Sequence, residues 1–245
     1  MNRVRFPVLA ALALLSCSVP VGAPIPVKEA SMKVHRVLLG PYETNGLILE
    51  DERTREALVV DAGGDADAAF RRIEAIGVKP VMLVHTHAHM DHCLQSVGLA
   101  KRLGVQSALH ADDLPLWRNL KRQVEMLMGP GSASALGLLD NEDPAVLVKD
   151  GDVLSFGDSK VEVVYLPGHS PGGIGLLWRG SPSVLISGDT LFRDGVGRTD
   201  LWGGSWEVLL KSIRERLFTL PDDTVVWSGH GDETTIGREK AGFTF

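Results

Sequence analysis

Val84-His-Thr-His-Ala-His-Met-Asp-His92 is the densest group of possible metal ligands in this chain of 245 residues. Four of the eight histidines of the sequence fall within it. An apolar run precedes it, so we expect it to follow the end of a buried strand. Residues two apart in an extended chain point to the same side, so His87 and His89 can share one ion. A helix that begins next turns Asp91 and His92 toward the same pocket. The stretch therefore predicts a metal site.

Three later positions repeat the arrangement of a strand followed by a glycine-flanked His or Asp. They lie in Leu166-Pro-Gly-His-Ser-Pro-Gly-Gly173, Ser187-Gly-Asp-Thr190 and Trp227-Ser-Gly-His-Gly231. Each alone is typical of a tight turn or a cap. Together they predict the rest of a ligand shell, because strand ends are where α/β proteins collect their chemistry. The candidate metal ligands are His87, His89, Asp91, His92, His169, Asp189 and His230.

Five imidazoles and two carboxylates are too many for one tetrahedral ion. They suit two divalent ions that share Asp189 and a water. Imidazole with carboxylate favours zinc, with iron or manganese as alternatives, and no thiolate ligand is needed. A closely spaced metal pair lowers the pKa of bound water from about 16 to roughly 7, so hydroxide exists at neutral pH. The pattern therefore indicates hydrolysis, with attack on a carbonyl carbon and metal charge stabilising the oxyanion.

The composition is that of an ordinary globular protein, with 44% hydrophobic and 23% charged residues. A net charge of -6 and a pI of about 5.7 argue against nucleic-acid binding, which requires a basic face. Two cysteines exclude a disulfide scaffold and a Cys-rich zinc finger. The long apolar run, Pro7–Leu15, is too short to span a bilayer, so we expect no integral membrane span.

Residues 1–31 differ from the rest of the chain. Arg3 and Arg5 precede an apolar stretch, which is the layout of a secretory signal peptide, and Leu14-Leu15-Ser16-Cys17 approximates a bacterial lipidation box. Either leader would place the protein in the cell envelope or periplasm. The alternative, which we favour, is a mis-assigned start, with Met32 as the true first residue of a cytoplasmic protein. Both interpretations leave one hydrolase domain over residues 32–245.

Hydrophobic patterning predicts strands and helices mixed over the whole length, which favours sheets with helices packed outside them. We expect strands near 33–39, 46–50, 57–61, 80–85, 106–109, 160–166, 174–178, 183–187 and 224–228. We expect helices at 65–76, about 91–103, 112–128 and 205–218, the first capped by Asp65 and the last by Ser205.

The ligand pattern resembles that of the metallo-β-lactamase-fold superfamily. Two stretches, Gly188-Asp-Thr-Leu-Phe-Arg-Asp-Gly-Val-Gly-Arg-Thr-Asp200 and Ser228-Gly-His-Gly-Asp-Glu-Thr-Thr-Ile-Gly237, are similar to its glyoxalase II branch, the hydroxyacylglutathione hydrolases, in the short bacterial form. The resemblance implies a four-layer αββα sandwich with the metals at one edge. It also implies one metal on His87, His89 and His169, and a second on Asp91, His92 and His230. Asp189 would bridge the two, and Asp91 would be the catalytic residue that orients the hydroxide.

The implied reaction is hydrolysis of a small-molecule thioester, S-2-hydroxyacylglutathione, to a 2-hydroxy acid and glutathione. Long glyoxalase II enzymes hold glutathione on a C-terminal helical domain, whereas 15 residues follow His230 here. The family has small residues after the last histidine of the motif, whereas this chain has Cys93-Leu94-Gln95. The thiol half of the substrate thus stays open. The alternatives are an iron-dependent persulfide dioxygenase, seen in relatives that share Gly197-Arg-Thr-Asp200, then a lactonase or β-lactamase, and a non-catalytic metal-binding module.

Other residues near these motifs have two interpretations each. Arg193 and Arg198 are candidates to bind a substrate carboxylate, or Arg198 pairs with Asp200 and holds its loop. Asp61 either hydrogen-bonds a metal-ligating histidine or caps a turn. We expect Cys93 and His85 to be buried packing residues rather than reactive groups. The apolar segments Met126–Met128 and Leu136–Leu139 either cover the pocket or belong to the core.

Overall fold

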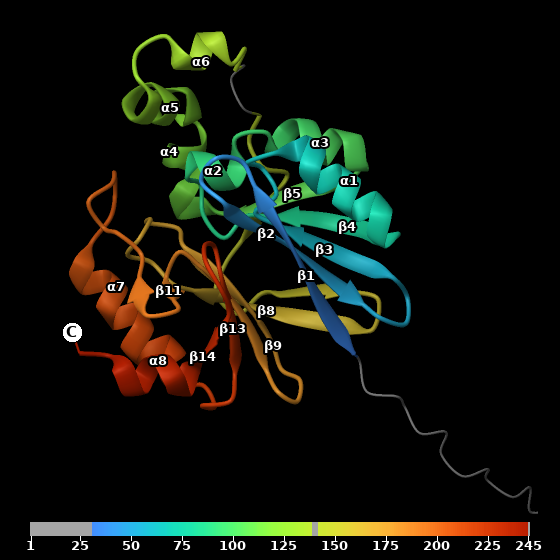
Figure 1. Cartoon of the computed structure of the whole chain (residues 1–245), viewed down its shortest axis with the longest axis vertical. Coiled ribbons are helices and arrows are strands. Elements are labelled where there is room, and N and C mark those ends of the chain that lie inside the picture. The colour runs from blue at the N-terminus through green and yellow to red at the C-terminus, as the bar shows by residue number, and fades with distance from the viewer. Residues whose placement is uncertain (1–30, 139–141, 245) are drawn as a thin grey trace, which may run out of the picture.

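The computed structural model describes residues 31–138 and 142–244, so the predicted leader lies outside the described residues except for Ser31. Two six-stranded sheets make up the centre of the molecule (Figure 1). The first has the order β1 (Met32–Leu39), β2 (Thr44–Asp51), β3 (Glu56–Val60), β4 (Lys79–Val84), β5 (Gln106–His110), β6 (Val146–Val148). The second has the order β14 (Thr234–Thr235), β13 (Val225–Ser228), β10 (Val184–Gly188), β9 (Ile174–Trp178), β8 (Ser159–Tyr165), β7 (Val153–Phe156).

The two sheets pack against each other, and alternation along each strand divides the core into layers. On β2, Leu47 and Leu49 point into the core between the sheets, whereas Ile48 points to the helices outside. On β9, Leu176 lies between the sheets and Leu177 faces the other helical layer. Both faces of each sheet are therefore covered, as an αββα sandwich requires.

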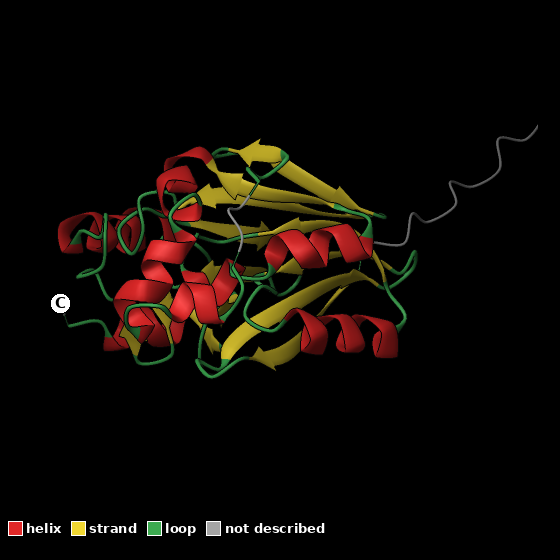
Figure 2. Cartoon of the chain, turned by 90° about the horizontal axis from the view of Figure 1, so that it is seen from above, coloured by secondary structure: helices red, strands yellow, loops and turns green. Residues whose placement is uncertain are grey.

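Helices form the outer layers (Figure 2). The first sheet is covered by α1 (Ala66–Ile76) and α3 (Ser96–Leu103). The second is covered by α7 (Trp206–Ser212), the π-helical turn η2 (Ile213–Leu217) and α8 (Ile236–Gly242). At one end lie α2 (Met90–Cys93), α4 (Leu114–Trp117), α5 (Leu120–Met128) and α6 (Ser132–Ala135), with the 3₁₀ turn η1 (Ala111–Asp113) before α4. The predicted αββα sandwich is confirmed.

Most predicted elements occur within a residue or two of their expected bounds, and Asp65 and Ser205 cap α1 and α7 as expected. The helix expected over about 91–103 is instead two helices, α2 and α3. The turn after β3 causes the break, because Gly63 N donates to His92 O and Gln95 N donates to Gly63 O. These bonds occupy His92 O and Gln95 N, which would otherwise form hydrogen bonds within one continuous helix.

The helix expected over 112–128 is likewise broken, into η1, α4 and α5. Here Asn119 leaves the helical conformation before α5, and its side chain donates to Pro115 O. Short strands β6, β7 and β14, the hairpin of β11 (Leu191–Phe192) with β12 (Gly195–Val196), and helices α6 and α8 were not predicted. Over the described part of the chain, no helix has the length and apolarity that crossing a bilayer requires.

Candidate metal centre

The predicted ligands lie at the same end of both sheets because each follows the end of a strand. The segment from His85 to His92 leaves β4 and enters α2. His169 lies in the turn between β8 and β9, Asp189 follows β10, and His230 follows β13. Strands β10 and β13 are parallel neighbours, so their carboxyl ends meet at one edge. Side chains more than 140 positions apart in the sequence thereby share one site.

One group consists of His87, His89 and His169, whose possible ligand atoms lie within 4.8 Å of one another. His89 Nδ1 is 2.8 Å from His169 Nε2. The far side of the His169 ring is held, since its Nδ1 lies 2.7 Å from Arg198 O and donates to that carbonyl. The structure therefore leaves His169 Nε2 with its lone pair toward the site.

The tautomer of His87 follows from a chain of hydrogen bonds. The Thr86 hydroxyl donates to Asp61 Oδ2 at 2.5 Å, and this uses its one proton. His87 Nδ1, which lies 3.1 Å from the same hydroxyl, must then be the donor of that contact. Its Nε2 carries the lone pair and faces the other histidines. This assignment follows from the hydrogen-bond network, and it suits a metal ligand.

A second group consists of Asp91, His92 and His230. Asp91 Oδ2 is 3.2 Å from Nε2 of each histidine and accepts a 2.9 Å hydrogen bond from the Thr44 hydroxyl. On the outer side of the rings, His230 Nδ1 lies 3.1 Å from Tyr42 O and donates to it. His92 Nδ1 lies 3.1 Å from Asp61 Oδ2. Asp61 thus lies beside His92 and acts on His87 through Thr86, which favours the first of its two predicted interpretations.

Asp189 lies between the two groups. Its Oδ1 is 3.5 Å from His92 Nε2, and its Oδ2 is 3.5 Å from Nε2 of both His169 and His230. The neighbouring backbone must be small, because a Cβ on Gly229 would stand 2.0 Å from Asp189 Oδ1. Asp189 is therefore placed where one carboxylate can reach both groups, as a bridging ligand must.

The surroundings of the possible metal-ligand atoms show whether cations fit between them. Within the described residues, His87 Nε2, His92 Nε2 and Asp189 Oδ1 are buried and have no hydrogen-bond partner. Buried polar atoms without partners are costly, and a bound cation would satisfy these three. Burial and neighbouring imidazoles hold the pKa of His87 well below its usual value, so its ring is a neutral ligand. Imidazole and carboxylate donors of this kind fit borderline divalent metals.

The charge states of the second group depend on its carboxylates. Burial by itself disfavours the charged forms of His92 and Asp91, but the charge of each side chain stabilises the opposite charge of the other. The carboxylates of Asp91, Asp189 and Asp61 raise the pKa of His92 well above its usual value. The adjacent histidines hold the pKa of Asp91 well below its usual range. The carboxylates thus favour a positive charge at this place, which a divalent cation would supply in place of the proton.

Two residues that brace the site were not predicted from the sequence. Asp113, fully buried at the end of η1, accepts hydrogen bonds from Ala88 N at 2.9 Å, Ser170 Oγ at 2.8 Å and Gly172 N at 2.5 Å. It ties the loop of His87 and His89 to the turn of His169. No local pattern marks Asp113, since its partners lie 25 to 59 positions away.

The second is Gln123 on α5. Its side-chain amide donates to Ala88 O and Leu116 O, both at 2.9 Å, and its carbonyl accepts from Met90 N at 3.2 Å. The side chain is buried, so these bonds fix α5 against the loop that contains the first ligands. Its position on the apolar side of α5 is the one local signal, because a buried amide there requires partners.

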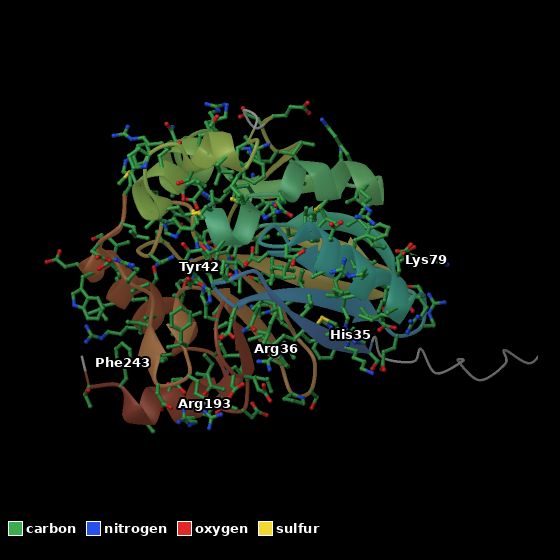
Figure 3. The ribbon with its side chains drawn as sticks, turned by 45° about the horizontal axis from the view of Figure 1, so that its top comes forward. His35, Arg36, Tyr42, Lys79, Arg193 and Phe243 are labelled. Atoms are coloured by element: carbon green, nitrogen blue, oxygen red, sulfur yellow. The ribbon has the colours of Figure 1, made fainter. Side chains whose placement is uncertain are left out.

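The remaining candidates have structural roles. Arg198 makes two hydrogen bonds to Asp200, at 2.6 and 2.7 Å, so it holds its own loop. The Arg193 guanidinium lies 3.8 Å from Asp232, and Figure 3 shows this residue toward the lower side, away from Tyr42. Cys93 is fully buried and its thiol contacts His89 O, as expected for a packing residue. Neither guanidinium group forms a described hydrogen bond or ion pair with the two groups of ligands, and Arg198 contacts His169 through its backbone carbonyl alone.

His85 is also a packing residue. It is buried, its ring lies 5.2 Å from that of Trp117, and burial lowers its pKa to about 4. By contrast, the Met126–Met128 segment is not core, since these side chains are 49–69% exposed on α5. Leu136 is 50% exposed as well. Of the two predicted interpretations of these segments, packing in the core is therefore wrong for these side chains.

Comparison with known proteins places these features in a family. The family model of the metallo-beta-lactamase superfamily matches residues 39–230. A probable metallo-hydrolase of Bacillus subtilis, YqgX, is 35% identical over 210 residues, or 85% of this chain and 95% of that protein. The hydroxyacylglutathione hydrolase GloC of Haemophilus influenzae is 33% identical over 211 residues, with the same two coverages.

Solved structures show the same similarity. The B3 metallo-beta-lactamase BLEG-1 is 33% identical, with a TM-score of 0.71 over 85% of this chain and 97% of that one. TTHA1623, solved in a di-iron-bound form, is 32% identical, with a TM-score of 0.71 over 84% and 97%. ETHE1 from Myxococcus xanthus is 25% identical, with a TM-score of 0.68 over 85% and 82%.

Proposed function

Because the chain belongs to the metallo-β-lactamase superfamily, we propose that it is a binuclear metal-dependent thioesterase. Its substrates would be of the S-2-hydroxyacylglutathione class. One observation supports two metals above all: two groups of ligands share one buried carboxylate, with Asp189 at 3.5 Å from imidazoles of both. The 33% identity to a hydroxyacylglutathione hydrolase supports the thioester.

In this proposal His87, His89 and His169 would hold one ion, Asp91, His92 and His230 would hold the other, and Asp189 would be shared between the two groups. When bound, the ions polarise the carbonyl and make water a nucleophile near neutral pH. Zinc is the first choice and iron or manganese the alternatives, and di-iron TTHA1623 supports iron.

The chain's own side chains orient the reactants. Asp91 Oδ2 faces the site beside His92 and His230, where it can accept a hydrogen bond from the attacking water and orient its lone pair toward the carbonyl carbon. The Thr44 hydroxyl fixes the rotamer of Asp91. A thiolate is a good leaving group, so no side chain is required to protonate it.

The test combines metal content with thiol release. Protein reconstituted with zinc, iron or manganese is expected to hold two ions per chain and to release free thiol from S-lactoylglutathione. Asp189→Ala is expected to lose metal and activity together, whereas Asp143→Ala, which removes an exposed carboxylate that pairs with Arg118, is expected to keep both. Full activity of Asp189→Ala would overturn the proposal.

A second candidate is iron-dependent persulfide dioxygenation, which uses one iron on two imidazoles and a carboxylate with open positions for oxygen. One observation favours it: His169 and Asp189 lie 3.5 Å apart beside His87 and His89, so such a set is present. One iron per chain, together with oxygen consumption on glutathione persulfide, would replace the thioesterase proposal. A β-lactam and a lactone should be assayed beside these two substrates, because the chain is similar to the metallo-beta-lactamase BLEG-1.

A further inference from the structure

An apolar hollow lies directly beside the candidate metal centre. Its lining includes His89, Arg122, Gln123, Met126, Leu201 and Trp202, and its volume is about 90 Å³. His89 belongs to the first group of ligands, so the hollow adjoins the candidate metal centre. Nothing in the catalytic proposal uses its other walls.

Both walls of the hollow are attached to the loops that contain the ligands. Helix α5 forms one wall and is fixed by the bonds of Gln123 to Ala88 and Met90. The loop that contains Leu201 and Trp202 forms the other. It is fixed where Arg198 O accepts from His169 and where Ser205 N donates to Gly168 O at 2.7 Å. The hollow is therefore part of the site rather than an accident of a mobile surface.

The two walls also meet each other. The Arg122 guanidinium lies 5.5 Å from the centre of the Trp202 ring, within the range of a cation–π contact. Met126 is 69% exposed and Trp202 is 47% exposed, although both are large and apolar. Large apolar side chains gathered at a functional site indicate an apolar ligand group, because covering them removes their surface from water.

We propose that this hollow binds the apolar chain of the acyl group, so that among thioesters the enzyme prefers those whose acyl group has a short alkyl chain over those that lack one. This deepens the thioesterase proposal and rests on it. A glutathionyl group is polar and charged, so of the two halves of the substrate the acyl half fits this lining. An apolar cavity of about 150 Å³ admits benzene, which scales to about three or four carbon atoms here.

The expected selectivity follows from burial of methylene groups. Each buried methylene is worth up to about fourfold in kcat/KM, from the usual transfer free energy of about 0.8 kcal/mol. We therefore expect S-butanoylglutathione to exceed S-acetylglutathione by about tenfold in the metal-loaded enzyme. The gain should level off at the hexanoyl thioester, when the hollow is full.

Two pairs of variants test the wall. Met126→Ala and Trp202→Ala are expected to reduce the butanoyl-to-acetyl ratio toward one. Met128→Ala is the matched control for the first, since it removes the same side chain from the same helix outside the hollow. Trp206→Ala is the matched control for the second. Both controls are expected to keep the wild-type ratio.

A binding measurement separates this inference from the thioesterase proposal. Butanoate and acetate are titrated calorimetrically into the zinc-loaded protein, with expected Kd ratios that parallel the kinetic ones. One outcome would support the acyl-binding role of the hollow and reject the thioesterase proposal. In that outcome no thioester is hydrolysed, butanoate binds about tenfold tighter than acetate, and Met126→Ala abolishes this difference in affinity. If thioesters are hydrolysed with no dependence on chain length, and the two carboxylates bind equally, the inference is overturned and the thioesterase stands.

Discussion

Replacing Asp113 by Asn tests whether the metal ligands are held in place from behind. The carboxylate uses Oδ2 for Ala88 N and Ser170 Oγ, and Oδ1 for Gly172 N. An amide has one oxygen, so at least one of these donors must face an NH₂ group. Asparagine has nearly the same volume, and therefore the substitution changes the hydrogen bonds without opening a cavity.

The magnitude has two parts. A hydrogen bond to a charged group contributes about 1.5–3 kcal/mol, and a buried donor left unpaired costs about as much. Burial raises the pKa of Asp113, so removing its charge offsets part of this loss. We expect the metal-free variant to lose about 1–2 kcal/mol of unfolding free energy. Removing groups that orient metal ligands costs about 10–100-fold in metal affinity, and we expect that range for zinc.

The assay is competition for zinc against a chromophoric chelator, with denaturant unfolding of the metal-free proteins measured in parallel. Asp143→Asn is the control, because it makes the same chemical change at an exposed ion pair. If Asp113→Asn binds zinc as tightly as the wild type while its unfolding free energy falls, Asp113 stabilises the fold only. The reasoning about ligand positioning would then be refuted.

Two further substitutions test two separate points: the position of Asp189 between the two groups of ligands, and the dependence of folding stability on acidic pH. Gly229→Ala would place its Cβ 2.0 Å from Asp189 Oδ1, so we expect metal content to fall about tenfold or more while circular dichroism stays native. Asp51 accepts from Thr54, Asp158 and Ser159, which lower its pKa against the effect of burial. A carboxyl group whose pKa is lower in the folded state stabilises the fold at pH values above its ordinary pKa of 3.8, and this stabilisation is lost as the pH falls. Asp51→Asn should therefore cost about 2 kcal/mol at pH 7 in urea unfolding, with the deficit shrinking below pH 4; a deficit independent of pH would contradict this.

Hydrophobic periodicity and helix-capping residues predicted those strands and helices that are determined by neighbouring residues in the sequence. Alternation placed β2, β3 and β9 within a residue or two, and Asp65 and Ser205 begin α1 and α7 as expected. The candidate ligands could also be found locally, because His and Asp after strand ends, flanked by glycine, mark positions where the chain turns at a sheet edge.

Features that depend on contacts between distant segments could not be found in this way. The break between α2 and α3 arises from backbone bonds to Gly63, some thirty residues earlier in the chain. Asp113 and Gln123 are an ordinary acidic residue and an ordinary amide until the fold brings them beside Ala88. The apolar hollow needs both α5 and Trp202, which lie on segments that only the packed structure joins.

The sequence by itself therefore determined the candidate metal ligands and the alternating segments that make two sheets with helices outside. Only the tertiary structure decided that six side chains form two groups around Asp189, which ring nitrogens of His87, His169 and His230 face the site, and which apolar surface adjoins them. The physical reason is that propensity and periodicity act over a few neighbouring residues. Strand order, buried hydrogen bonds and cavity shape depend instead on contacts that form between distant parts of the chain.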